Sequence, residues 1–194
     1  MRILMLGNSF TFTNDLPALL AERTGAEVVG HTRGGARLSE QLNPETKMGA
    51  KTLDALTNQH WDYVVLQEMS NAPLKTKERF LESVSRLCEK ARLCGATPVL
   101  YATWAYQPQS QKLAESGFSY EEMSRGLALA YAEAAEKNQA LLAPVGDAFF
   151  QENQKNNLYA SDGFHPNLAG SLLAADVLAQ TIQKDQTKQQ KNAK

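Results

Sequence analysis

The sequence has few of the residues from which disulfide frameworks and metal sites are built. It contains two cysteines and three histidines among 194 residues. Cys88 and Cys94 lie six residues apart, a spacing that fits neither a zinc knuckle nor a short redox motif, so we expect two reduced thiols. The histidines are scattered, with no cluster of cysteine or aspartate beside them, which argues against a catalytic metal.

Charge of one sign and long apolar runs are also lacking. A formal net charge of -1 provides no general attraction for a polyanion, so nucleic acid is not expected as a partner. No apolar run is long enough to cross a bilayer, so no membrane association is expected. The apolar residues at the N-terminus are too few for a secretory signal and lead into a polar turn. We therefore expect a cytoplasmic protein.

Short apolar runs alternate with longer segments of helical period, a pattern typical of a parallel sheet covered by helices on both faces. Strands are predicted at residues 2–6, 27–31, 63–67, 98–102 and 141–145. Helices are predicted at residues 16–23, 49–57, 76–93, 120–137 and 168–182. The expected fold class is α/β, a three-layer α/β/α domain over residues 1–183 with a flavodoxin-like, five-stranded parallel sheet. Residues 184–194 are almost wholly polar and are expected to form a disordered tail.

The loop after the first predicted strand reads Gly-Asn-Ser-Phe-Thr, residues 7–11. In an open parallel sheet, ligands bind at the carboxyl ends of the strands, so this loop is a natural place for chemistry. Gly7 permits a tight turn that would expose the hydroxyl of Ser9 near the start of a helix. The same residues also suit an ordinary turn or a helix N-cap. The loop alone therefore does not identify a nucleophile.

A second polar loop, residues 161–167, precedes the last predicted helix. A serine hydroxyl needs a base, and an imidazole acts best when a carboxylate fixes its tautomer. Asp162 and His165 supply these two groups across a turn that contains Gly163. The alternative is that Asp162 caps the turn and His165 is an ordinary polar loop residue.

Two further loops at this edge could stabilise an oxyanion. Gly34 and Gly35 follow the second strand, where a glycine lets a backbone N–H approach a substrate closely. Asn71 follows the third strand, and its side-chain amide can donate a hydrogen bond. Glycine pairs and asparagine turns are common, so neither loop is informative alone. Together, four loops at one sheet edge carry the residue types that acyl transfer requires.

This combination resembles the SGNH hydrolases, the GDSL-like esterases, from residue 7 to the final helix. The resemblance implies that Ser9 is the nucleophile and that its own N–H is one oxyanion donor. It implies that Gly35 is a second donor, with Gly34 in its place if the alignment shifts by one residue, and that Asn71 is the third. Asp162 and His165 match the D-x-x-H block of the family.

The resemblance implies a hydrolase that cleaves carboxylic esters through a Ser-His-Asp triad. It also implies a small-molecule ester as substrate and no cofactor. This chain departs from the family pattern at three positions. Asn8 replaces the usual aspartate before the serine, and Met69 and Ala72 replace the glycine and aspartate around the asparagine. Residues 67–72 instead resemble the Q-G-E-S-N block of carbohydrate acetylesterase branches, which favours short-acyl esters on a sugar.

Other functions remain open from the sequence. A lysophospholipase or thioesterase would use the same residues, and a carbohydrate-binding relative could keep the fold without catalysis. A phosphate-binding loop at residues 7–11 would leave Asp162 and His165 unexplained, and it lacks the lysine of a P-loop. Trp104 and Tyr106 could shape an acyl or sugar pocket or could simply pack their loop. Neither acyl length, alcohol nor oligomeric state is specified.

Overall fold

The computed structural model describes residues 1–192, in which five strands form one parallel sheet. The order is β2-β1-β3-β4-β5, the flavodoxin-like order, and the predicted fold class is confirmed. Each strand begins and ends within two residues of its predicted position. The strands are β1 (Arg2–Gly7), β2 (Glu27–Thr32), β3 (Tyr63–Leu66), β4 (Thr97–Tyr101) and β5 (Leu141–Ala143).

Five long helices occupy the segments predicted to be helical, and shorter ones that were not predicted lie in the loops. The long helices are α2 (Leu16–Thr24), α4 (Lys47–Asn58), α6 (Lys77–Leu93), α8 (Tyr120–Lys137) and α10 (Leu168–Asn192). The others are α1 (Ser9–Phe12), the 3-10 turn η1 (Thr13–Asp15), α3 (Leu38–Gln41), α5 (Ala72–Lys75), α7 (Gln111–Ser116) and α9 (Val145–Glu152). No helix within residues 1–192 has the length and apolarity needed to span a membrane.

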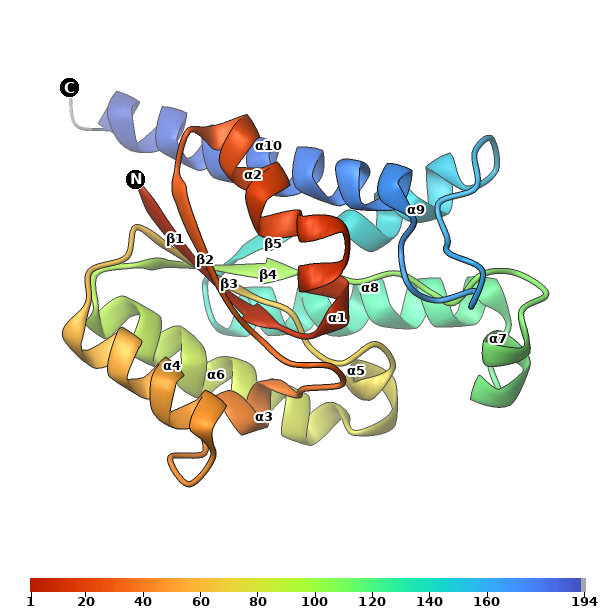
Figure 1. The fold of residues 1–194 in the computed structure, drawn as a ribbon, viewed down its shortest axis with the longest axis horizontal. Coiled ribbons are helices and arrows are strands. Elements are labelled where there is room, and N and C mark those ends of the chain that lie inside the picture. The colour runs from red at the N-terminus through yellow and green to blue at the C-terminus, as the bar shows by residue number, and fades with distance from the viewer. Residues whose placement is uncertain (193–194) are drawn as a thin grey trace.

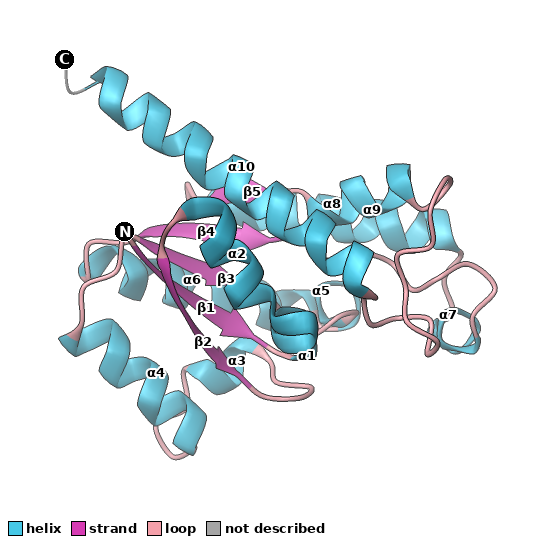
Figure 2. Cartoon of the chain, turned by 45° about the horizontal axis from the view of Figure 1, so that its top comes forward, coloured by secondary structure: helices cyan, strands magenta, loops and turns pink. Residues whose placement is uncertain are grey.

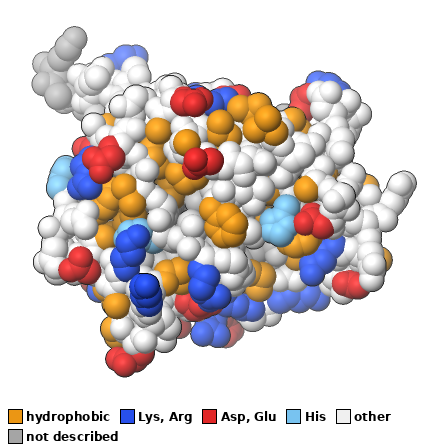
Figure 3. Space-filling view, in the orientation of Figure 1, with side chains coloured by type: hydrophobic (Ala, Val, Ile, Leu, Met, Phe, Trp, Pro, Cys, Tyr) orange, Lys and Arg blue, Asp and Glu red, His pale blue; other side chains and the backbone are white. Residues whose placement is uncertain are grey.

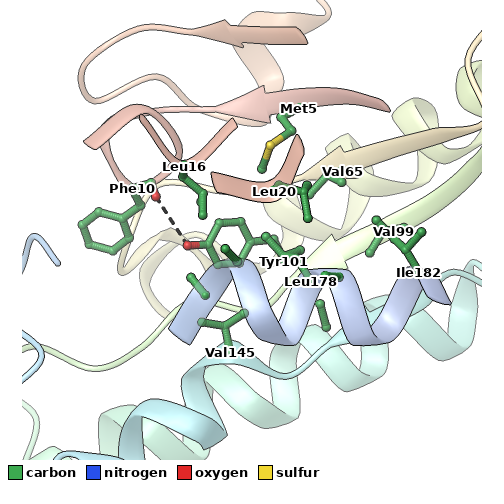
Figure 4. Close-up of a cluster of buried hydrophobic side chains, with 14 of the residues drawn as sticks. Met5, Phe10, Leu16, Leu20, Val65, Val99, Tyr101, Val145, Leu178 and Ile182 are labelled. Carbon is green, nitrogen blue, oxygen red and sulfur yellow. Dashed lines mark hydrogen bonds between the residues drawn. The ribbon is translucent and has the colours of Figure 1, made fainter. Parts of the chain in front are cut away.

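The helices cover the sheet on both faces, with α2 and α10 on one side and α4 and α6 on the other (Figure 1; Figure 2). On the α2 and α10 face, Met5 and Val99 pack against Leu20 and Leu178 (Figure 4). The next residue on the first strand, Leu6, belongs to the core of the opposite face. Since alternate residues enter different cores, β1 is buried on both sides, which explains its continuous apolar run.

The C-terminal segment differs from the prediction of a disordered tail. Residues 184–192 continue α10, which extends beyond the sheet in both ribbon views (Figure 1; Figure 2). Asp185 accepts a hydrogen bond of 3.0 Å from the hydroxyl of Tyr63. The physical reason is that a helix nucleated on its packed residues gains one hydrogen bond for each residue added, and lysine and glutamine are good helix formers. The rest of the predicted tail, residues 193–194, lies outside the described residues.

Candidate active site

The loops that follow β1, β2 and β3 meet the loop before α10 at the carboxyl edge of the sheet. Here the short helices α1, α3 and α5 lie at the ends of the first three strands (Figure 1). An open pocket of about 630 Å³ lies among these loops, and its walls include all of the predicted site residues except Asp162. Its lining is made by Asn8, Ser9, Phe10, Gly34, Gly35, Met69, Ser70, Asn71, Tyr106, Lys112, Glu115, Ser116, Phe164 and His165.

The structure brings Ser9, His165 and Asp162 into one chain of hydrogen bonds. The Nε2 atom of His165 lies 2.8 Å from the Oγ atom of Ser9, although 156 residues separate them in the sequence. The other ring nitrogen, Nδ1, lies 2.6 Å from Oδ2 of Asp162. A hydroxyl, an imidazole and a carboxylate in this order form the arrangement that transfers a proton away from a nucleophile.

Local backbone structure sets the position of the histidine. Oδ1 of Asp162 accepts hydrogen bonds from the backbone N–H groups of Phe164 and His165, at 3.1 and 3.0 Å, which closes the turn. Gly163 has a φ of +74°, and an added Cβ would lie 2.6 Å from the Cβ of Ser110. A residue with a side chain would therefore strain this turn and displace the histidine.

Ser9 is the first residue of α1, and Asn8 alone separates it from the end of β1 at Gly7. Asn8 is the N-cap, and its side chain accepts a hydrogen bond from the N–H of Phe10. The direct change from strand to helix is a sharp bend, which presents the serine hydroxyl at the edge of the sheet.

The electrostatics of the loop favour an ionised Asp162. Burial disfavours the charged carboxylate, but the hydrogen bonds from the His165 side chain and from two backbone N–H groups outweigh it, so the pKa of Asp162 is lowered. The carboxylate is thus ionised at neutral pH and can stabilise a positively charged imidazole.

The predicted oxyanion donors line the pocket beside Ser9. In the turn that follows β2, the Ala36 N–H is bonded to Arg33 O at 3.0 Å, and Gly35 has a φ of +66°. Within residues 1–192 no hydrogen bond engages the N–H groups of Gly34 and Gly35 or the side-chain amide of Asn71. These donors are therefore free for a ligand.

Part of the pocket wall comes from α7, which was not predicted. This helix places Lys112 and Glu115 at the pocket, and the Lys112 ammonium lies 5.3 Å from the ring centre of Phe164. The Ser110 side chain caps α7 and Gly117 ends it in the left-handed region. These two residues are the usual signals for helix ends, and they would have located the helix in the sequence.

The two aromatic residues after β4 differ in role. Trp104 is 1% exposed and is stacked between Phe10 and Phe149, with ring centres at 4.6 and 4.0 Å. It packs the loop and does not line the pocket. Tyr106 does line the pocket, and its hydroxyl lies 2.7 Å from the Oγ atom of Ser70.

The remaining histidines and the cysteines lie away from the pocket. His31 is buried at the end of β2, with Nδ1 3.1 Å from the Thr52 hydroxyl. His60 is exposed and lies just before β3, at the amino edge of the sheet. Both cysteines are free, and residues 1–192 contain no group of three cysteine, histidine, aspartate or glutamate side chains placed to hold a metal ion.

Solved structures share this fold. An SGNH hydrolase candidate from Slackia heliotrinireducens is 51% identical, with a TM-score of 0.90 over 94% of this chain and 98% of its own. A catalytic mutant of an acetylxylan esterase from Geobacillus stearothermophilus is 13% identical, with a TM-score of 0.67 over 93% of each chain. An α/β hydrolase enzyme from the metagenome of Lake Arreo, Spain, is 18% identical, with a TM-score of 0.68 over 93% of this chain and 94% of its own. The last two likenesses show the fold alone.

Among curated proteins, none matches this chain. A family model described as GDSL-like lipase/acylhydrolase matches residues 5–173. The matched stretch covers most of the chain and contains both the Ser9 loop and the Asp162–His165 turn. On this match, the chain belongs to the GDSL-like lipase/acylhydrolase family of hydrolases.

Proposed function

We propose that this protein is a serine esterase that hydrolyses carboxylic esters of short acyl groups, with residues 1–183 as its catalytic domain. The observation that carries the proposal is the continuous chain from Ser9 Oγ through His165 to Asp162, with contacts of 2.8 and 2.6 Å. Free backbone and amide donors face the same pocket, so both the nucleophile and the charge that develops on the carbonyl oxygen have partners.

In the first half of the reaction, Ser9 Oγ attacks the ester carbonyl carbon while His165 Nε2 takes the hydroxyl proton. Asp162 holds the imidazole and stabilises its positive charge. The carbonyl oxygen becomes an oxyanion, which accepts hydrogen bonds from the N–H groups of Ser9 and Gly35 and from the Asn71 amide. The carbon–oxygen bond to the alcohol then breaks, His165 donates its proton to the departing oxygen, and an acyl ester remains on Ser9.

In the second half, a water molecule replaces the alcohol. His165 takes a proton from the water, whose oxygen attacks the acyl carbon and again forms an oxyanion held by the same donors. The bond to Ser9 then breaks, and the proton on His165 returns to the serine oxygen. The products are a carboxylic acid and the free enzyme, and the two half-reactions use the same base and the same donors.

We favour an acetyl ester on a carbohydrate as the substrate class. The pocket is open and has aromatic surfaces on Tyr106 and Phe164, together with polar groups such as Lys112 and Glu115 that can bind hydroxyls. The similarity of residues 67–72 to carbohydrate acetylesterase sequences, and the fold shared with an acetylxylan esterase, support the same choice.

The test is hydrolysis of p-nitrophenyl esters of increasing acyl length by the wild type, by Ser9→Ala and by Ser161→Ala as a matched control. Ser161 is an exposed serine in the loop of Asp162 and does not line the pocket. We expect turnover that is fastest for acetate, lost in Ser9→Ala and kept in Ser161→Ala. No hydrolysis by the wild type, or full activity in Ser9→Ala, would overturn the proposal. Fastest turnover of long acyl chains would instead indicate a lysophospholipase or thioesterase.

A further inference from the structure

Asn8 precedes the proposed nucleophile and stands where relatives usually have aspartate. It is 3% exposed, and its side chain makes two hydrogen bonds of opposite direction. Oδ1 accepts from the N–H of Phe10 at 3.1 Å, and Nδ2 donates to the carbonyl oxygen of Ala36 at 3.0 Å. Because one bond needs an acceptor and the other needs a donor, an amide satisfies both where a carboxylate satisfies only the first.

The backbone of Asn8 is held by a second buried amide. Oε1 of Gln67, which is 0% exposed, accepts from the Asn8 N–H and from the Thr11 hydroxyl, both at 2.9 Å. Its Nε2 donates to the carbonyl oxygen of Glu68. Gly7 makes room for this contact, since an added Cβ there would lie 2.5 Å from Gln67 Oε1 and 2.4 Å from Thr11 Oγ1.

These bonds join three loops whose residues the proposed reaction uses. Gln67 begins the loop that leads from β3 to Asn71, Asn8 precedes Ser9, and Ala36 directly follows Gly35. The Gly34–Gly35 turn is also tied beyond Ala36, because the carboxylate of Glu68 accepts from the N–H of Leu38 at 3.4 Å. With Asn8, Gln67 and Glu68 all buried, water cannot easily replace these bonds, so each one has a large effect on geometry.

We propose that Asn8 is a positioning residue, whose amide fixes the Gly34–Gly35 turn at the distance from Ser9 at which a glycine N–H reaches the oxyanion. The inference rests on the proposed function and concerns the alignment of its donors. It also says that this chain requires an amide at position 8, so the aspartate usual in the family is the wrong residue here.

Asn8→Asp is the most informative substitution, because it breaks one of the two side-chain hydrogen bonds and keeps the other. The substitution keeps the shape of the side chain and the bond from the Phe10 N–H, but it places a carboxylate oxygen against the Ala36 carbonyl oxygen. Two acceptors at 3.0 Å repel each other, so the turn that carries Gly35 moves away from Ser9. A displacement of about 1 Å in a catalytic arrangement costs on the order of 100-fold in rate.

The experiment compares the wild type with Asn8→Asp and Asn8→Ala in p-nitrophenyl acetate hydrolysis, in labelling of Ser9 by a fluorophosphonate and in thermal unfolding. We expect kcat to fall about 100-fold in Asn8→Asp and about 10-fold in Asn8→Ala, with KM within about threefold of the wild type. Labelling should slow in parallel, because the phosphoryl oxygen uses the same donors. The larger loss in the variant of more similar shape is the signature of a repelled turn.

Asn138→Asp is the matched control. The Asn138 side chain donates to the Ala134 carbonyl oxygen at 2.9 Å, far from the pocket, so this variant also loses an amide–carbonyl bond. We expect a lower unfolding temperature and an unchanged kcat.

Four results would count against the inference. A folded Asn8→Asp with the kcat of the wild type would overturn it, as would a change in unfolding temperature with no change in kcat. If Asn8→Asp does not fold, a folded Asn8→Ala with wild-type kcat overturns it equally. A wild type that hydrolyses no ester would remove the proposed function and the inference together, whereas an active wild type beside an unaffected Asn8→Asp removes the inference alone.

Discussion

Two histidine–aspartate pairs lie at opposite edges of the same sheet. At the amino edge, His60 Nε2 is 3.7 Å from Asp62 Oδ1. At the carboxyl edge, His165 Nδ1 is 2.6 Å from Asp162 Oδ2. The histidine side chain is 70% exposed in the first pair and 25% exposed in the second, while both aspartates are 42% exposed. The same two residue types therefore occur in a loose pair and in a tight one.

The surroundings of each pair explain the difference. At the amino edge, Asp62 accepts from the N–H of Arg2, and the Arg2 side chain donates to the His60 carbonyl oxygen and forms an ion pair with Glu27. These contacts join β1, β2 and the start of β3, which is a structural role. At the carboxyl edge, the second ring nitrogen of His165 contacts the Ser9 hydroxyl. The parallel strands bring this hydroxyl to the histidine, so position in the fold, and not residue type, distinguishes the two pairs.

The largest expected difference between the pairs is in the loss of the imidazole. We predict that His165→Gln lowers kcat/KM for p-nitrophenyl acetate by at least about 10⁴-fold, because the base that takes the serine proton is gone. His60→Gln should leave kcat/KM within about twofold. Steady-state kinetics of both purified variants, with circular dichroism to check folding, decides this. An equal loss of kcat/KM in the two variants would contradict the claim that only His165 takes part in the reaction.

A smaller difference is expected for the carboxylates. Asp162→Asn removes the charge that stabilises the imidazolium, and we predict a loss in kcat of about 10²- to 10³-fold. The loss is smaller than that for a fully buried triad aspartate because water screens this exposed carboxylate. Asp62→Asn keeps an oxygen that can accept from the Arg2 N–H, so kcat should be unchanged. A normal kcat in Asp162→Asn would show that the tight pair does not serve the reaction.

The third histidine, His31, is expected to affect the pH dependence of stability and not catalysis. Burial lowers the pKa of His31 to about 4, with a further contribution from Lys51. Below pH 6.5 the unfolded chain binds a proton that the folded chain does not bind, so the free energy of unfolding falls as the pH falls. At pH 5 this loss is about 2 kcal/mol. Urea unfolding at pH 7 and pH 5 should therefore show a smaller pH effect in His31→Gln, with little change in kcat. An equal pH effect in both proteins would assign the acid sensitivity to other groups.

The sequence predicted the sheet, the long helices and the residues of the Ser9–His165–Asp162 chain. Apolar runs and helical periods extend over many residues, so they can be recognised in the sequence alone. Asp162 and His165 could be predicted for a different reason. Their turn is formed by neighbouring residues and requires Gly163, so the sequence shows it directly. Their meeting with Ser9 followed from the general rule that parallel strands direct their carboxyl-end loops to one edge.

Other features were missed for other reasons. The helix α7, which forms part of the pocket wall, has only one or two turns, too few for a periodic signal, and only its cap residues Ser110 and Gly117 mark it in the sequence. The hydrogen bond from Asn8 to Ala36 joins two loops, and the sequence showed only that the aspartate was missing. The helical end of α10 was missed because composition alone ignores the packed turns that precede it.

The central claim is that His165 activates Ser9, and covalent labelling tests it most directly. Folded wild-type protein is treated with a fluorophosphonate, and the modified residue is located by mass spectrometry in the wild type and in His165→Gln. The account predicts a single adduct on Ser9 in the wild type and at least about 10³-fold slower labelling without the imidazole. An adduct on another residue, or labelling of Ser9 at the same rate in both proteins, would contradict it.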